Sequence, residues 1–277
     1  MLHTFPVTKN NPLCVKVQPT TGKKAPEALK KNDITLPYVS DKHRIAAIYQ
    51  SDSSWDGRRS SMKETEQIAF FGGSFDPPHL GHLAVAEAAL RAGACGHVAW
   101  VPAYAPPHKR GAGAAFADRL AMVEATVAGH DAMSANRIED ELKLNPSYTF
   151  EILEAWERRF GAAPALLIGE DSLKELHTWH RAVELAERFR IISYPRNGSS
   201  VTAAELARVW PERTAEKLFA GVLAGDFFEI SSSELKKRME KFTEAGDIIH
   251  LKEFLAPGVC DYIVKHGLYV GKRRDDE

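Results

Sequence analysis

Short apolar runs alternate with helical segments along most of this chain, and this alternation constrains its fold more than any other feature. We expect strands at residues 68–71, 97–102, 165–168, 189–193 and 227–230, with a weaker one near 134–138. Between the strands, apolar residues recur at helical spacing, as at Phe116, Leu120, Val123 and Val127, and at Phe150, Leu153 and Trp156. This order predicts an α/β fold: a Rossmann-like parallel sheet with helices on both faces. Ligands bind such sheets at the carboxyl ends of the strands.

The net charge, the length of the apolar runs and the cysteine count exclude several classes of protein. The net charge of −1 at pH 7 gives no overall electrostatic signal for a nucleic acid or a membrane surface. No apolar run is long enough to cross a membrane, and the first residues lack the apolar core of a signal peptide. The three cysteines, Cys14, Cys95 and Cys260, are widely separated and odd in number, which argues against a disulfide framework. We therefore expect a cytoplasmic protein.

The sequence predicts three parts. Residues 1–63 combine lysines, serines and prolines with only short apolar patches, so we expect a mostly disordered N-terminal extension. Residues 64–271 carry the convincing strand and helix patterns and are expected to form a single domain. Residues 272–277 are all charged and predict a polar tail.

The first predicted strand leads into Phe-Phe-Gly-Gly-Ser-Phe-Asp-Pro-Pro-His-Leu-Gly-His at residues 70–82. Gly72 and Gly73 have no Cβ and let backbone N–H groups turn toward a bound anion. We expect Asp76 to cap a helix whose first turn holds one of the prolines that follow it, because the N–H that proline lacks has no helical partner there.

Two histidines at the start of that helix complete the motif. His79 and His82 stand at i and i+3, so both imidazoles lie on one face of the first turn, where the helix dipole favours phosphates. Taken alone, the pair also fits half of a zinc site or two surface side chains. A zinc site needs further ligands, and the nearest, His97 and His108, lie in other elements without CxxC or HExxH context. The whole ordered motif favours phosphate binding.

Further polar segments follow other predicted strands. A proline-rich loop after the second strand brings His108 and Lys109 to the same edge of the sheet. Asp171 follows the strand at 165–168, and downstream of it Trp179 fits either a core position or an aromatic face stacked on a planar base. After the last strand, Ser231 and Glu234 fit a capping box that opens a helix. The hydroxyls and cations there also fit a second phosphate site: Ser231, Ser232, Ser233, Lys236 and Arg238.

Residues 68–269, which contain these motifs, resemble the bacterial nicotinate-nucleotide adenylyltransferases of the HxGH nucleotidylyltransferase superfamily. The segments that carry the resemblance are 72–77, 79–82, 106–109, 147–149, 168–173, Trp179, 230–233, 255–257, 262–263 and 267–269. The block from 147 to 179 separates this family from relatives such as phosphopantetheine adenylyltransferase. The resemblance implies a single catalytic domain that transfers the adenylyl group of ATP to nicotinic acid mononucleotide, giving nicotinic acid adenine dinucleotide and pyrophosphate in NAD biosynthesis.

Residues and resemblance together suggest a role for each motif. The expected catalytic residues are His79, His82 and Lys109. The expected ATP contacts are Gly72, Gly73, Ser74, Phe75, Gly81, Asp171, Ser231, Ser232, Ser233, Lys236 and Arg238. The resemblance implies that Tyr148, Thr149 and Trp179 bracket the pyridine ring of the mononucleotide and its carboxylate, and His108 is a further expected contact to the mononucleotide. We expect Mg²⁺ as cofactor, held mainly by substrate phosphates and not by a protein metal site.

Departures from the family pattern leave alternatives open. Ser74 replaces a threonine and keeps the hydroxyl, whereas Lys236 replaces an arginine and loses its planar fork, so Lys236 and Arg238 both remain candidates for the phosphate contact. The acceptor could instead be nicotinamide mononucleotide or another phosphate. A non-catalytic nucleotide-binding module would predict loss of His79 or His82, and both are present. The expected partners are ATP and the mononucleotide, without nucleic acid or membrane, and a homo-oligomer is left open.

Overall fold

The computed structural model describes residues 67–104, 113–195, 200–225, 230–242 and 245–269. The predicted N-terminal extension 1–63 and the polar tail 272–277 lie outside these ranges, as do His108, Lys109 and most of the strand predicted at 227–230. Within the described ranges, no helix has both the length and the apolar character needed to span a bilayer.

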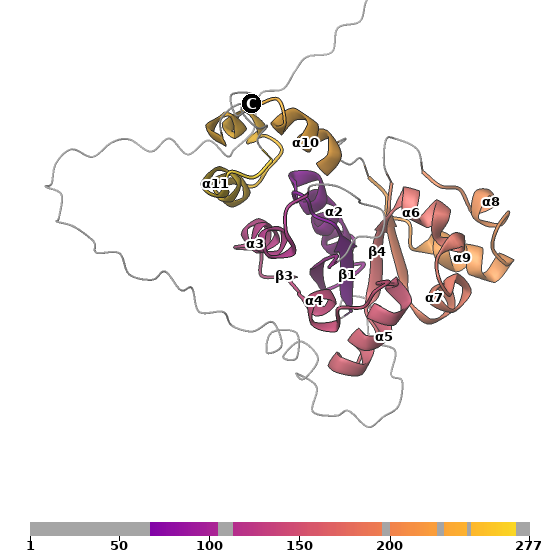
Figure 1. Cartoon of the computed structure of the whole chain (residues 1–277). Coiled ribbons are helices and arrows are strands. Elements are labelled where there is room, and N and C mark those ends of the chain that lie inside the picture. Colours follow the sequence, from indigo (N-terminus) through magenta and orange to yellow (C-terminus); the bar gives the residue numbers. More distant parts are fainter. Residues whose placement is uncertain (1–66, 105–112, 196–199, 226–229, 243–244, 270–277) are drawn as a thin grey trace, which may run out of the picture. The chain divides into compact units, whose positions relative to one another are not determined.

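A parallel sheet forms the centre of the fold, with strand order β3-β2-β1-β4-β5 (Figure 1). Its described strands are β1 Ile68–Gly73, β2 His97–Pro102, β3 Met133–Ala135, β4 Ala165–Gly169 and β5 Ile191–Tyr194. Every neighbouring pair is parallel, which confirms the predicted sheet. β1 pairs with β2 on one side and with β4 on the other, so the chain runs outward from β1 through β2 to β3 and then crosses back past β1 to β4. The ends of β1 and β4 therefore form the switch point at which open α/β sheets bind ligands.

Helices cover both faces of the sheet, as the strand patterns require. Figure 1 shows α2 (Leu80–Arg91) and α3 (Phe116–Val127) on one side, with α5 (Thr149–Phe160), α7 (Ala182–Arg188) and α9 (Glu212–Ala220) on the other. Along β1, Ala69 and Phe71 pack toward α2 and α3, whereas Ile68 and Phe70 pack toward α5, because successive side chains of a strand point to opposite faces. The shorter helices are α4 (Ile138–Leu142), α6 (Glu170–Glu175), η2 (Leu176–Thr178) and α8 (Ala203–Leu206).

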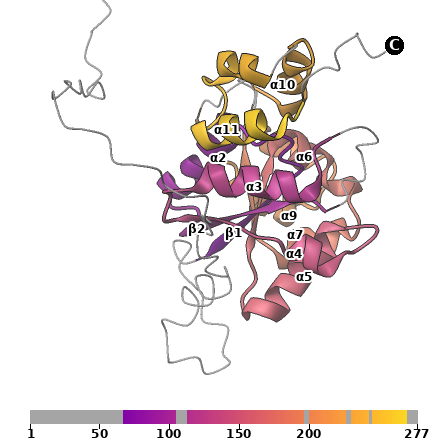
Figure 2. The ribbon, with the colours of Figure 1, turned by 60° about the vertical axis from the view of Figure 1, so that its left-hand side comes forward.

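The C-terminal helices form a third core against α3. They are α10 (Ser232–Met239), η3 (Ala245–Leu251) and α11 (Pro257–His266). Met122 of α3 is buried together with Leu235, Val259 and Ile263 of this group. Figure 2 shows α11 lying along α3, with α10 beyond it. The C-terminal helices therefore lie next to the start of α2, where the histidine motif lies.

Several predicted boundaries move by a few residues. The strand predicted at 189–193 begins at Ile191, because Phe189 still closes α7. The weak strand predicted at 134–138 is β3, which ends at Ala135. The chain turns there because the side chain of Asn136 accepts a hydrogen bond from the N–H of Ile138, the first residue of α4 (2.9 Å).

Candidate active site

The two histidines of the motif lie face to face at the start of α2. His79 is the N-cap residue, and its ring stacks on that of His82 at a centroid distance of 3.7 Å. The backbone N–H of His79 donates to Nδ1 of His82 (3.2 Å), so a neutral His82 carries its proton on Nε2. The prediction that both imidazoles share one helical face is confirmed. The geometry gives His82 a fixed Nε2–H donor at the carboxyl end of β1.

Gly81 and Phe75 both pack against this histidine pair. A Cβ on Gly81 would lie 2.9 Å from Nδ1 of His79 and 3.2 Å from Ile230, so only glycine lets both side chains approach. Phe75 is buried with its ring centroid 5.1 Å from that of His82. The side chain of Phe75 therefore supports His82 from the core, and the predicted contact of Phe75 with ATP would have to come from its backbone.

The paired glycines continue the strand instead of forming the turn. Gly72 and Gly73 are the last residues of β1, and the carbonyl of Gly73 accepts a hydrogen bond from the N–H of Ala103 (2.8 Å). The predicted turn therefore begins at Ser74. Strand pairing with β2 extends to both glycines, which is why the apolar run at 68–71 underestimates the strand.

The prediction that Asp76 caps α2 is wrong. The N-cap is His79, and the Asp76 carboxylate instead binds donors from distant segments: Lys236 Nζ (2.7 Å), the hydroxyl of Tyr269 (2.7 Å) and the N–H of Ala114 (3.0 Å). Burial alone would raise the pKa of Asp76, but these donors hold that pKa below its usual value. The ionised carboxylate therefore stabilises the fold fully at pH values above the pKa that Asp76 has in the unfolded chain. This stabilisation is lost as the pH falls through the lower pKa that Asp76 has in the folded protein.

Arg119 on α3 joins the two loops that follow β1 and β2. Its guanidinium donates to the carbonyls of Ser74 (2.7 Å), Ala103 (2.7 Å) and Ala114 (3.2 Å), and the residue is only 4% exposed. Burial lowers the pKa of Arg119, while the negative charge of Asp76 opposes this effect. The loops that leave β1 and β2 are thus fixed to each other by one buried cation that no sequence motif singles out.

The amino end of α10 meets the histidine motif, as the second predicted phosphate segment requires. Ser231 caps the helix by accepting from the N–H of Glu234 (3.1 Å), which confirms the capping interaction, and Ser232 donates to the carbonyl of Pro77 (2.8 Å). Ser233 is exposed at the first turn. Two helix N-termini, those of α2 and α10, therefore converge next to the histidine pair.

Lys236 and Arg238, the two cations of α10 predicted to bind phosphate, contact different partners. Lys236 reaches Asp76 beside the histidine motif, whereas Arg238 pairs with Glu234 on its own helix (3.1 Å) and lies over the ring of Phe254. Lys236 is thus the cation that α10 brings to the site. Asp171, on the first turn of α6, follows β4 at the switch point and is exposed.

A second group of predicted residues gathers at the start of α5. Tyr148 is the N-cap residue of α5 and Thr149 its first residue. The ring of Tyr148 is 43% exposed and stacks on His180 at 4.2 Å, which brings the half-buried Trp179 into the same region. His180 was missed by the sequence analysis, although it directly follows a predicted site residue.

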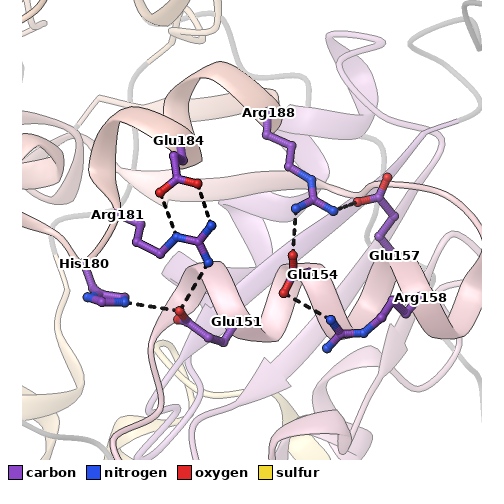
Figure 3. A network of polar contacts seen from close by, with 8 residues as sticks. All are labelled: Glu151, Glu154, Glu157, Arg158, His180, Arg181, Glu184 and Arg188. Carbon is purple, nitrogen blue, oxygen red and sulfur yellow. Dashed lines mark hydrogen bonds and ion pairs between the residues drawn. The ribbon is translucent and has the colours of Figure 1, made fainter.

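Ion pairs join the helices that carry this group (Figure 3). Glu151 of α5 pairs with His180 (3.2 Å) and lies 3.8 Å from Arg181, the N-cap residue of α7. Further along, Arg188 of α7 binds two glutamates of α5, Glu154 (2.9 Å) and Glu157 (2.6 Å). The guanidinium of Arg181 also lies 3.7 Å above the ring of Phe150. Tyr148 and Trp179 therefore lie next to the first residues of α5 and α7, two helices that several ion pairs join.

Glu139 links the acceptor group to the loop after β2. One carboxylate oxygen, Oε2, accepts from the N–H of Tyr104 (3.0 Å) and from the hydroxyl of Ser147 (3.0 Å). Burial raises the pKa of Glu139 despite these two donors. Ser147 directly precedes Tyr148, and Tyr104 is the last described residue before the segment that contains His108 and Lys109.

Comparisons with known proteins show the family to which this chain belongs. A family model described as cytidylyltransferase-like matches residues 70–238, so the chain is a nucleotidyl-transfer domain of that class. The "Probable nicotinate-nucleotide adenylyltransferase" of Gloeobacter violaceus is 35% identical over 209 residues, covering 74% of this chain and 96% of the relative. The protein of the same name from Neisseria gonorrhoeae is 34% identical over 207 residues, covering 74% and 98%. This chain belongs to the nicotinate-nucleotide adenylyltransferase family.

A solved structure shares the fold. Plasmodium falciparum nicotinic acid mononucleotide adenylyltransferase complexed with NaAD aligns with a TM-score of 0.56 at 19% identity, covering 73% of this chain and 96% of that one. The same enzyme complexed with APC gives a TM-score of 0.55. The Rossmann-like architecture predicted from the sequence is confirmed.

Proposed function

We propose that this protein transfers the adenylyl group of ATP to nicotinic acid mononucleotide, giving nicotinic acid adenine dinucleotide and pyrophosphate. The observation that carries the proposal is the convergence of the His79–His82 stack with the amino end of α10 at the switch point of the sheet. The names of the relatives and the NaAD bound to the Plasmodium enzyme support the choice of substrates.

To catalyse this reaction, the protein has to position the two substrates and stabilise the negative charge on the reacting phosphates. The 5′-phosphate of the mononucleotide attacks the α-phosphorus of ATP, a new P–O bond forms, and the bond to the β-phosphate breaks as pyrophosphate leaves. This nucleophile is already ionised near neutral pH, so no general base is needed. His82 presents its Nε2–H to the reacting phosphates beside His79, and the start of α10 with Lys236 binds the rest of the triphosphate. The contacts of α10 favour Lys236 over Arg238 for this role.

We propose that Mg²⁺ is held mainly by the substrate phosphates. When bound, it shares the charge of the triphosphate. Within the described ranges, no group of three or more His, Cys, Asp and Glu side chains is placed to hold a metal ion, and a phosphate-bound ion needs no such group. Gly72, Gly73, Ser74 and Asp171 complete the proposed ATP site, and Lys109 and His108 stay predictions because they lie outside the described residues.

The acceptor site is proposed at Tyr148, Thr149 and Trp179. Turnover with nicotinic acid mononucleotide is expected to exceed that with nicotinamide mononucleotide at least about tenfold in kcat/KM, because donors aimed at a carboxylate are mispaired by the amide. A pyrophosphate-release assay with both acceptors, at saturating ATP and Mg²⁺, gives the ratio. Equal values would indicate dual specificity, and a preference for the amide would overturn the choice of acceptor.

Glu139 is expected to support acceptor binding through its two hydrogen bonds. Glu139→Ala frees both Tyr104 and Ser147, and we expect the KM for the mononucleotide to rise about five- to tenfold with little change in the KM for ATP. Glu139→Gln keeps an accepting oxygen and should stay close to wild type. Asp140→Ala on the same helix removes only an exposed pair with Arg137 and serves as control. A rise in both KM values for Glu139→Ala would contradict the assignment.

The remaining sequence predictions are kept as proposals. The domain limits 64–271, a cytoplasmic location and the absence of nucleic acid or membrane partners rest on the sequence alone. Cys95 and Cys260 are free and buried, in line with thiols that serve packing.

A further inference from the structure

The Asp76 carboxylate joins three segments that lie far apart in the sequence. Its Oδ2 accepts from Lys236 Nζ at 2.7 Å, and its Oδ1 accepts from the Tyr269 hydroxyl at 2.7 Å and the Ala114 N–H at 3.0 Å. Asp76 is only 3% exposed. A buried carboxylate is stable only when donors satisfy it. Each of the three donors therefore helps to fix the position of the carboxylate, and the fixed carboxylate in turn fixes the positions of the other two donors.

Two residues at this junction have backbone conformations that side-chain-bearing residues rarely adopt. Tyr269 has a φ of 64°, and Phe75, directly before Asp76, has a φ of 45°. Bulky residues keep such conformations only where the surroundings determine them strongly. Strain on both sides of the Tyr269–Asp76 hydrogen bond indicates that this contact is positioned for a purpose beyond packing.

The Tyr269 hydroxyl is a permanent donor. Burial first, and then the hydrogen bond to Asp76, raise the pKa of Tyr269 far above its ordinary value. The phenol therefore keeps its proton at any physiological pH and donates it to the carboxylate.

Lys236 needs an anchor if it is to act at a defined place. Its ammonium is a point charge on a flexible four-carbon stem, unlike the rigid fork of an arginine. The contact with Asp76 uses one of three N–H donors, which leaves two for a ligand. The side chain of Lys236 is 18% exposed, so part of it remains accessible from solvent.

On the basis of the proposed function, we propose that Tyr269 is a positioning residue for ATP: through Asp76 it holds the Lys236 ammonium at the triphosphate end of the site. Tyr269 touches no reacting group itself. The C-terminal segment after α11 is thus part of the nucleotide site, although it lies 193 positions from the carboxylate it binds.

Tyr269→Phe in the full chain tests this proposal, because it removes the hydroxyl and keeps the ring. We expect the KM for ATP to rise about tenfold while the KM for the mononucleotide changes less than about twofold. Tyr262→Phe is the matched control, since it removes a hydroxyl of α11 that donates to Asp118 (3.0 Å) and not to Asp76. The proposal would be overturned if the KM for ATP did not change in Tyr269→Phe. It would also be overturned if that KM rose equally in Tyr269→Phe and Tyr262→Phe.

A double-mutant cycle shows whether Tyr269 acts through Lys236. In a Lys236→Met background, Tyr269→Phe should change ATP affinity no further, whereas independent, additive losses would contradict the proposed linkage. Calorimetric binding of a non-transferable ATP analogue to the same variants measures the effect without turnover. If the wild-type chain fails to transfer an adenylyl group, the proposed function fails. The analogue then still tests Tyr269, which is supported by about tenfold weaker binding to Tyr269→Phe and overturned by equal binding.

Discussion

His82→Ala is expected to lower kcat about a hundredfold or more while leaving the fold intact. The variant loses the Nε2–H donor that the hydrogen bond from the His79 backbone fixes in place. Removal of one preorganised donor to developing charge costs about two to three orders of magnitude in comparable sites. His82 is only partly buried, so its loss should change the melting temperature little.

The measurement is kcat and KM for both substrates, with circular dichroism as a check on folding. His250→Ala, which removes an exposed imidazole of η3, is the control and should keep wild-type turnover. A His82→Ala enzyme with unchanged kcat would remove His82 from the mechanism.

Arg119→Met is expected to lower the free energy of unfolding by about 3–5 kcal/mol. Methionine fills much of the space, but three partly buried carbonyls lose a charged donor, and the carboxylates of Asp76 and Glu139 lose a nearby positive charge. Leaving buried polar groups without a partner costs on this scale.

Urea unfolding followed by circular dichroism measures this loss. Arg91→Met is the matched control, because Arg91 is exposed on α2 and, among the described residues, pairs only with Glu87 one turn away (3.2 Å), a contact worth less than about 0.5 kcal/mol. Similar destabilisation in the two variants would contradict the role assigned to Arg119.

Local patterns in the sequence were sufficient to predict the sheet and the histidine pair. The strands could be predicted because each buried run is bounded by polar or turn residues, and α3 spans the residues that its apolar spacing indicates. The stacking of His79 and His82 follows from their positions in a single helical turn. Each of these predictions depends on residues that are close in sequence.

Interactions between distant segments could not be predicted in the same way. Asp76 has the residue type of a helix cap and is followed by proline, yet its carboxylate binds Lys236, 160 positions away, and Tyr269. Arg119 stands in an amphipathic helix where an arginine ordinarily faces water, and only the three carbonyls that surround it make it a buried anchor. Glu139 likewise has no motif around it, since its role depends on where Tyr104 and Ser147 come together.

The central claim is adenylyl transfer to nicotinic acid mononucleotide, and the fate of a radiolabel tests it most directly. The full chain is incubated with the mononucleotide, Mg²⁺ and ATP labelled at either the α- or the γ-phosphate, and the products are separated. We expect the α-label in nicotinic acid adenine dinucleotide and the γ-label in pyrophosphate, both only when the mononucleotide is present. A γ-label transferred to the acceptor, or released as inorganic phosphate without dinucleotide formation, would contradict the account.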